Sequence, residues 1–229
     1  MKRIALPIIS VMVVTGILFF SCGKENTPAS NASSNPDNAS PGARFENDPT
    51  FSEWFDENKD RLNDVTWQEI VSFMNNIELQ KQIFIALSSE TRATVWIQKM
   101  DYLVTLPEFS TQEIAYLNSV KSQITADLFV SSPAPGSANH TKLQAMRSDG
   151  EVIFPMERLF RILANLDFAG RQNSGGTDEC SCSTTSDWCD FPVQVPGGHC
   201  SSFQCNSESS GGCGTLWTYS CDGDCTVGA

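Results

Sequence analysis

Eight of the nine cysteines of this 229-residue chain lie in its last fifty residues, and none lies between residues 22 and 180. A segment of about fifty residues with few large apolar side chains cannot build a stable core alone, so covalent cross-links must contribute much of its stability. Each disulfide contributes roughly 2–4 kcal/mol. The sequence therefore predicts a small disulfide-rich domain of loops and short strands over residues 180–229. Its four bridges would use Cys180, Cys182, Cys189, Cys200, Cys205, Cys213, Cys221 and Cys225.

Zinc is the alternative use for such a set of cysteines. Structural zinc sites pair short C-x2–4-C knuckles, often with histidines at fixed spacing. Here the spacing is C-x-C-x6-C-x10-C-x4-C-x7-C-x7-C-x3-C, and His199 is the only histidine nearby. Disulfides are therefore favoured, and no metal or other cofactor is expected. Eight cysteines allow 105 pairings, and the sequence disfavours only those with Cys180–Cys182, which would close a strained ring.

The N-terminal residues have the composition of a secretion signal. Lys2 and Arg3 precede an apolar run, Ile4–Phe20, which is short for a membrane-spanning helix. The run ends at Ser21-Cys22 and resembles a bacterial lipoprotein signal, although Phe19 stands where leucine is usual. We therefore predict a signal peptide over residues 1–21 and a lipid on Cys22, which would leave an even number of cysteines. The alternatives are a signal-anchor helix or a cleaved signal with a leftover cysteine.

Residues 22–44 are predicted to form a tether behind this lipid. Most of them are small, polar or proline, so they cannot bury enough surface to offset the entropy lost on folding. Gly23 stands where an inner-membrane retention signal has aspartate. The predicted location is the cell envelope, as an outer-membrane lipoprotein held to the membrane through Cys22, with extracellular release as a further option.

Residues 45–171 have the periodicity of an α-helical domain. Thr66–Glu69 and Ser110–Glu113 match the capping-box pattern that begins helices. Apolar side chains recur at helical spacing after both boxes, and their most economical interpretation is core packing. The predicted helices begin near Thr66, at about residue 78, after a cap at Ser89, near Ser110 with continuation to Leu128, and at Pro155 with an end near Gly170. Residues 131–141 are predicted to be a loop in which His140 is solvated.

The cysteine motifs resemble a known family. Cys180–Cys189 and Cys213–Cys225 are similar to the cysteine-rich part of the bacteriocin fulvocin C-related family. The stretch Leu87–Trp96 is similar to that family's Leu-Ser-x-Glu stretch leading into a tryptophan. The family has the same order of secretion signal, helical region and cysteine block. The resemblance implies antibacterial or toxin-like activity for the cysteine-rich domain, with a target-cell receptor or an immunity protein as partner.

Charge excludes several functions. The formal net charge is −12, and no Lys or Arg follows Arg171. Nucleic-acid binding and cationic membrane disruption both need clustered basic residues, so neither is expected. Asp222-Gly-Asp224 is interpreted as a turn rather than a calcium loop, and Cys200 beside His199 as bridged rather than nucleophilic. No catalytic residues and no enzymatic motif are identified, so we expect no enzyme.

Two functions remain. One is a bacteriocin-like effector that is secreted or displayed on the surface. The other is a non-toxic surface lipoprotein whose disulfide-bonded part binds or stiffens. They differ in whether the cysteine-rich part leaves the cell and whether it harms a neighbour. Residues 172–179 are predicted to be a linker, and Arg171, Gly175 and Gly176 mark a polar, glycine-containing hinge at which proteases would cut. Gly175-Gly176 also resembles the end of some bacteriocin leaders, but a plain linker is favoured. A cut there would release a fragment of about fifty residues.

Overall fold

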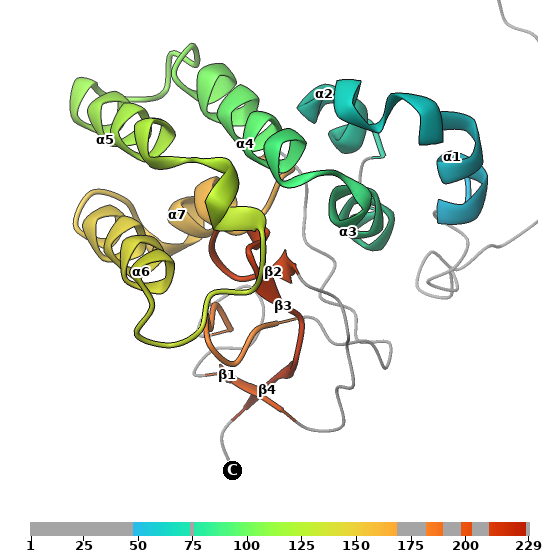
Figure 1. Cartoon of the computed structure of the whole chain (residues 1–229). Helices are drawn as coiled ribbons and strands as arrows, with labels where there is room; N and C mark the ends of the chain where they lie inside the picture. Colours follow the sequence, from blue (N-terminus) through green and yellow to red (C-terminus); the bar gives the residue numbers. More distant parts are fainter. Residues whose placement is uncertain (1–47, 74–75, 169–181, 190–197, 203–210, 228–229) are drawn as a thin grey trace, which may run out of the picture. The chain divides into compact units, whose positions relative to one another are not determined.

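The computed structural model describes residues 48–73, 76–168, 182–189, 198–202 and 211–227 (Figure 1). All the described residues belong to one compact unit of the chain. The predicted signal peptide, Cys22 and the whole of the tether lie outside the described residues. Within the described ranges, no helix is long and apolar enough to cross a membrane.

The described residues up to 168, called here the helical region, form α-helices joined by short 3-10 turns. The central element is α4 (Ser89–Leu103), which packs against α2, α5 and the 3-10 turn η4. These elements enclose a core in which Phe84, Trp96 and Leu117 are fully buried. The remaining bounds are α1 Phe51–Asn58, η3 Lys59–Asp64, α2 Trp67–Val71, α3 Ile77–Ala86, α5 Thr111–Gln123, η4 Ala126–Phe129, α6 Ala138–Glu151 and α7 Met156–Leu163.

Both predicted capping boxes are confirmed. The Thr66 and Ser110 side chains accept hydrogen bonds from the backbone N–H groups of Glu69 and Glu113, and each glutamate reaches back to the cap. The predicted cap of α4 is wrong by one residue. Ser88 is extended (φ −64°, ψ 159°) and its hydroxyl accepts from the Thr91 N–H, so Ser89 is the first helical residue.

Four further boundaries differ from the sequence prediction, and one of them is the end of α7, which lies at Leu163 rather than near Gly170. The helix from Ser110 ends at Gln123 because Ile124 and Thr125 are extended, and the chain then turns through η4 to bury Leu128. The predicted loop over residues 131–141 ends early, because the Ser137 hydroxyl caps α6 and places His140 in its first turn. Pro155 is the N-cap of α7 rather than a residue of its first turn.

The described residues 182–189, 198–202 and 211–227, called here the cysteine-rich segment, form two small antiparallel sheets. Strand β1 (Gly198–Ser201) pairs with β4 (Asp224–Val227), and Cys200 lies opposite Cys225. Strand β2 (Gly212–Cys213) pairs with β3 (Tyr219–Ser220), and the 3-10 turn η5 (Thr215–Trp217) joins them. The predicted fold class, a helical region followed by a small disulfide-rich part with short strands, is confirmed.

The helical region and the cysteine-rich segment share one hydrophobic core. Trp188, Leu216, Trp217 and Tyr219 belong to the same buried cluster as the core residues of α3, α4 and α7. The sequence places a linker over residues 172–179 between these parts, and that stretch lies outside the described residues. In Figure 1, β2 and β3 lie beside α3 and α7, whereas β1 and β4 lie farther from the helices.

Candidate functional site

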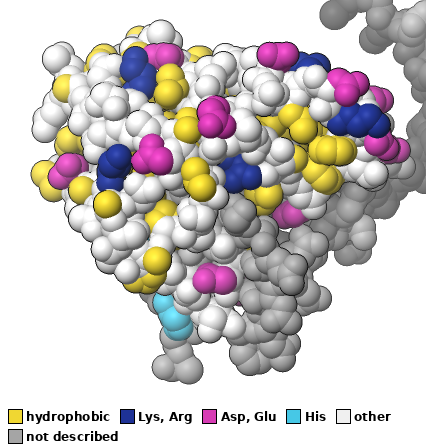
Figure 2. Space-filling view, in the orientation of Figure 1, with side chains coloured by type: hydrophobic (Ala, Val, Ile, Leu, Met, Phe, Trp, Pro, Cys, Tyr) yellow, Lys and Arg dark blue, Asp and Glu magenta, His cyan; other side chains and the backbone are white. Residues whose placement is uncertain are grey.

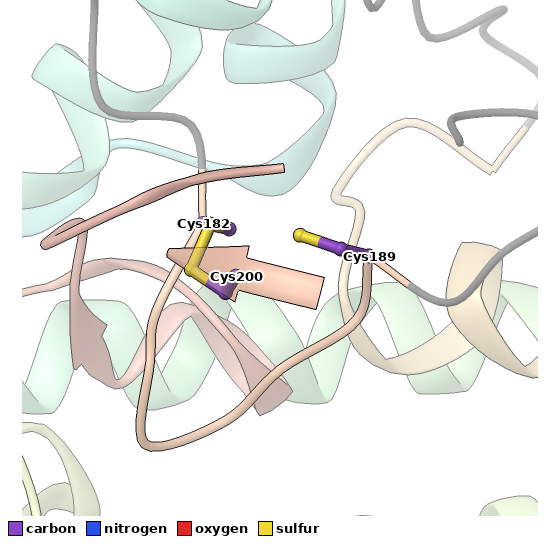
Figure 3. Close-up of side chains that lie close together, drawn as sticks. All are labelled: Cys182, Cys189 and Cys200. Carbon is purple, nitrogen blue, oxygen red and sulfur yellow. A yellow bond between two sulfur atoms is a disulfide. The ribbon is translucent and has the colours of Figure 1, made fainter. Parts of the chain in front are cut away.

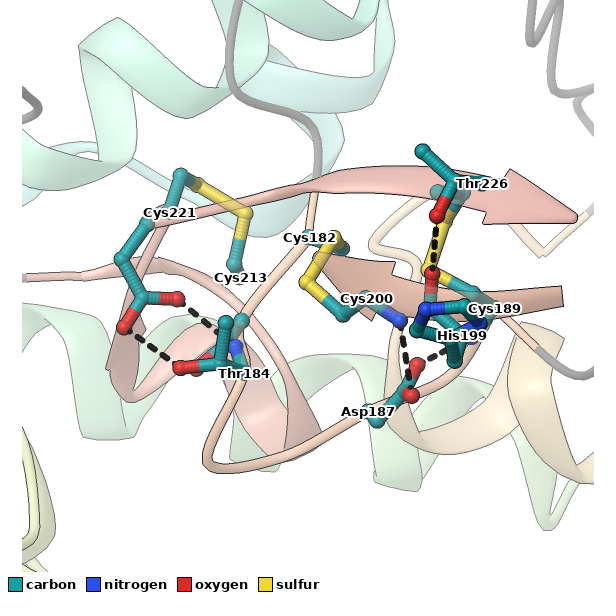
Figure 4. Close-up of a disulfide and its surroundings, with 12 residues drawn as sticks. Cys182, Thr184, Asp187, Cys189, His199, Cys200, Cys213, Cys221 and Thr226 are labelled. Atoms are coloured by element: carbon teal, nitrogen blue, oxygen red, sulfur yellow. Dashed lines mark hydrogen bonds between the residues drawn. A yellow bond between two sulfur atoms is a disulfide. The ribbon is translucent and has the colours of Figure 1, made fainter. Parts of the chain in front are cut away.

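Six of the eight predicted cysteines form three disulfides, Cys182–Cys200, Cys189–Cys225 and Cys213–Cys221 (Figure 4). Their Cα atoms are 5.9, 5.3 and 5.1 Å apart, within the usual range for disulfides. The other two cysteines, Cys180 and Cys205, lie outside the described residues. The site is therefore a covalently stapled segment, as the cysteine density predicts.

Two of these disulfides lie side by side. The sulfur atoms of Cys182, Cys189 and Cys200 all lie within 4.8 Å of one another (Figure 3), a spacing that would also suit a metal ion. Zinc binds thiolate sulfur. Each of these sulfurs is instead bonded to another sulfur, Cys182 to Cys200 and Cys189 to Cys225. The cluster is thus explained by two adjacent disulfides.

Two aspartates brace the stapled segment. The Asp187 carboxylate accepts hydrogen bonds from the backbone N–H groups of Cys189 (2.7 Å) and Cys200 (2.8 Å), so it ties both adjacent disulfides together (Figure 4). The Asp222 carboxylate accepts from the Thr184 N–H (2.7 Å) and the Thr184 hydroxyl (2.9 Å). The predicted turn at Asp222-Gly-Asp224 is wrong, because Gly223 forms an antiparallel bridge with Cys182 and Asp224 begins β4.

Trp217 is the main contact between the cysteine-rich segment and the helices. Its side chain is 2% exposed, and its indole N–H donates to the Ala164 carbonyl at 2.9 Å. Its ring meets those of Phe84 and Trp96 edge to face, with centroids 5.5 and 6.4 Å apart. Both arrangements are the favourable ones for aromatic pairs. Trp217 therefore fills the space between α3, α4 and the end of α7.

Tyr219 makes a second contact, with α6. Its hydroxyl lies 3.1 Å from Nδ1 of His140, and the two rings are perpendicular. Burial raises the pKa of Tyr219 to about 12. The prediction of a solvated His140 is therefore wrong: it is half-buried and joins α6 to β3. Sequence reasoning missed this contact because its two residues are 79 positions apart.

Trp188 makes a third contact, with α6 and α7. Its ring packs edge to face on Phe160, with centroids 5.8 Å apart, and the Arg147 guanidinium lies 4.3 Å from its centroid. Arg147 also donates to the Asp187 carbonyl. The Trp188 indole N–H donates to the Thr215 hydroxyl at 3.3 Å, which links this contact to η5.

The chain at η5 adopts an uncommon conformation. Leu216 and Trp217 both have φ of 55°, in the left-handed region that bulky side chains rarely adopt. Gly214 precedes them with φ of 68°, and a Cβ there would lie 2.6 Å from the Ser186 Cβ. Such a conformation persists only where the surroundings determine it. At η5 this conformation is held by the aromatic contacts of Trp217 and by the complete burial of Leu216.

A buried lysine holds the end of α7, against which Trp217 docks. Lys99 on α4 is fully buried, and its ammonium donates to the carbonyls of Arg161 (2.7 Å), Ile162 (2.8 Å) and Asn165. Burial lowers its pKa well below the ordinary value, and the Asp167 charge opposes that effect. Sequence reasoning missed this residue, because nothing in its local pattern separates a buried lysine from a solvated one.

Some of the residues singled out from the sequence are not among those that the structure describes. Cys22, Arg171, Gly175 and Gly176 lie outside the described residues. On the face in Figure 2, basic and acidic side chains are scattered rather than gathered into a patch of one sign. The chain matches no model of a known protein family, no curated protein and no solved structure.

Proposed function

We propose that this chain is a bacteriocin-like lipoprotein of the cell envelope, whose cysteine-rich segment is the effector part. The signal and Cys22 support attachment to the membrane. The three disulfides support an oxidising environment outside the cytosol. The resemblance of the two cysteine motifs to the fulvocin C-related family supports antibacterial activity, exerted through a receptor of the target cell because the segment lacks basic residues.

One observation determines the role that this proposal gives to the helical region. Trp217 lies in the core of the helical region rather than on the surface of an independent knot. An effector packed in this way acts together with its helices until something separates them. The proposal therefore gives the helical region the role of carrier.

The same observation favours a second candidate, a non-toxic surface lipoprotein. If the segment never leaves the helices, the disulfides simply stabilise one exported binding or structural unit. The two candidates differ in whether neighbouring cells are inhibited, and in no feature of the described fold.

Fractionation with a killing assay separates the candidates. The wild type should carry a fatty-acid label and fractionate with membranes, and Cys22→Ser should lose the label and become soluble. Culture supernatant and purified oxidised protein are then applied to related strains, with protein unfolded by reduction as the control. Inhibition by oxidised protein alone supports the effector. Absence of inhibition together with an intact membrane-bound protein supports the surface module, and a label that survives Cys22→Ser contradicts the lipoprotein.

A further inference from the structure

The large apolar side chains in the described part of the cysteine-rich segment all point into the shared core. Trp188, Leu216, Trp217 and Tyr219 are 6, 0, 2 and 1% exposed. Three of them pack against rings on the helices: Trp188 on Phe160, Trp217 on Phe84 and Trp96, and Tyr219 on His140. From these contacts we infer that the helical region is a binding partner for residues 211–221. It keeps the segment's apolar face covered even after the connecting chain is cut.

The fit between the two parts is close along the backbone as well as at the side chains. Gly211 and Gly212 have φ of 133° and 96°, and they run along α3. A Cβ at Gly212 would lie 3.1 Å from the Ile85 side chain, and one at Gly211 would lie 3.6 Å from the Arg92 guanidinium. The dihedral angles favour glycine at both positions, and at Gly212 the close approach of Ile85 on α3 favours it as well.

Three polar groups of the cysteine-rich segment are paired with groups of the helical region. The Trp217 indole N–H donates to the Ala164 carbonyl, and the Ser220 N–H donates to the Ser132 hydroxyl at 3.3 Å. The Tyr219 hydroxyl meets His140 on α6. Buried aromatic side chains in well-packed, desolvated pockets carry most of the binding energy in protein interfaces. The contact therefore has the composition of a binding interface, with Trp217 as its anchor.

This arrangement deepens the proposed function and rests on it. If the segment is an effector, its apolar face is the surface available to meet a target, and that face is covered in the whole chain. A protease cut between residues 168 and 182 breaks one peptide bond and leaves the interface intact. Release would require a second event that competes for Trp217, such as an apolar surface of the target.

The inference is tested on the full exported chain after folding and oxidation. A protease recognition sequence replaces residues 172–179, and the folded protein is cut there. We expect the two pieces to elute together in size-exclusion chromatography at micromolar concentration, and to separate only in denaturant. Separation in native buffer would overturn the inference. This readout does not depend on killing, so it stays interpretable if no strain is inhibited.

The anchor is tested by substitution in the cut protein. Trp217→Phe keeps an aromatic ring but leaves the Ala164 carbonyl without its donor, so the dissociation constant should rise about tenfold. Trp54→Phe makes the same change on α1, whose tryptophan contacts Phe51 instead, and should leave the constant unchanged. Equal effects of both variants would contradict the anchor role. If Trp217→Phe does not fold, Tyr219→Phe removes only the hydroxyl facing His140 and should also weaken binding; no change would count against the interface.

Discussion

At the scale of single residues, a few buried polar groups position the end of α7. The carbonyls of Arg161, Ile162 and Asn165 accept hydrogen bonds from the Lys99 ammonium. The Ala164 carbonyl accepts from the Trp217 indole, and the Leu166 carbonyl accepts from the Trp67 indole at 3.0 Å. These donors come from α4, η5 and α2. A helix end buried without such partners would be strongly unfavourable. The C-terminal end of α7 is thus the point where the helical region and the cysteine-rich segment are held together.

The first prediction concerns Lys99. Lys99→Met should lower the free energy of unfolding by more than about 3 kcal/mol, because it leaves several buried carbonyls without a donor. Lys121→Met is the matched control, since Lys121 forms an exposed ion pair with Asp101 at 2.7 Å. Such pairs contribute about 0–1 kcal/mol. Urea unfolding of both variants measures the difference, and similar small effects would contradict the role assigned to Lys99.

A second prediction at this scale concerns alkaline pH. Burial raises the pKa of Tyr219 from 10.0 to about 12, so the folded state holds this proton over a range in which the unfolded state has released it. Its contribution to stability is complete below pH 10 and is lost as the pH rises through 12. Urea midpoints measured between pH 9 and pH 12 should therefore fall, and they should fall less steeply in Tyr219→Phe. Identical slopes would show that Tyr219 does not titrate in this way.

At the scale of elements, features set by neighbouring residues could be predicted from the sequence, and features set by long-range packing could not. The capping boxes at Thr66 and Ser110 were predictable because cap and partner lie three residues apart. The break after Gln123 was not, since it depends on the packing of η4 against α4. The start of α6 was missed although its cap, Ser137, lies three residues before His140. The disulfide-rich character followed from cysteine density, but the choice of partners did not. The docking of η5 also lacked a sequence signal, because it joins residues far apart in the chain.

The cap of α4 provides the prediction for this scale. Ser88→Ala should destabilise the protein by about 1 kcal/mol, because it removes the acceptor for the Thr91 N–H at 3.2 Å. Ser89→Ala should change stability by a few tenths of a kcal/mol at most, since Ser89 lies inside the helix and its hydroxyl caps no backbone N–H. Thermal or urea unfolding of the two neighbours gives the comparison. A larger loss from Ser89→Ala would restore the cap expected from sequence.

At the scale of the whole molecule, the described residues form one packing unit, and its disulfides all lie in the cysteine-rich segment. The disulfides constrain the segment that carries Trp188, Trp217 and Tyr219, and these side chains complete the core of α3, α4, α6 and α7. Because the two parts share this core, the disulfides are expected to stabilise the helices as well as the segment that they cross-link. Reduction of the disulfides is then expected to destabilise the helical region as well as the cysteine-rich segment.

The last prediction follows from this coupling. The oxidised protein should unfold in one transition, with helix ellipticity and tryptophan fluorescence changing at the same temperature. Reduction should lower that temperature by at least about 10 °C, since each lost disulfide removes roughly 2–4 kcal/mol and each kcal/mol shifts the midpoint by a few degrees. The decisive signal is the helix ellipticity, because the three disulfides lie wholly outside the helices. Independent domains would keep an unchanged helix midpoint after reduction, and that result would contradict both the shared core and the carrier role. A common shift would instead show that the helices depend on the docked segment, as the burial of Trp217 requires.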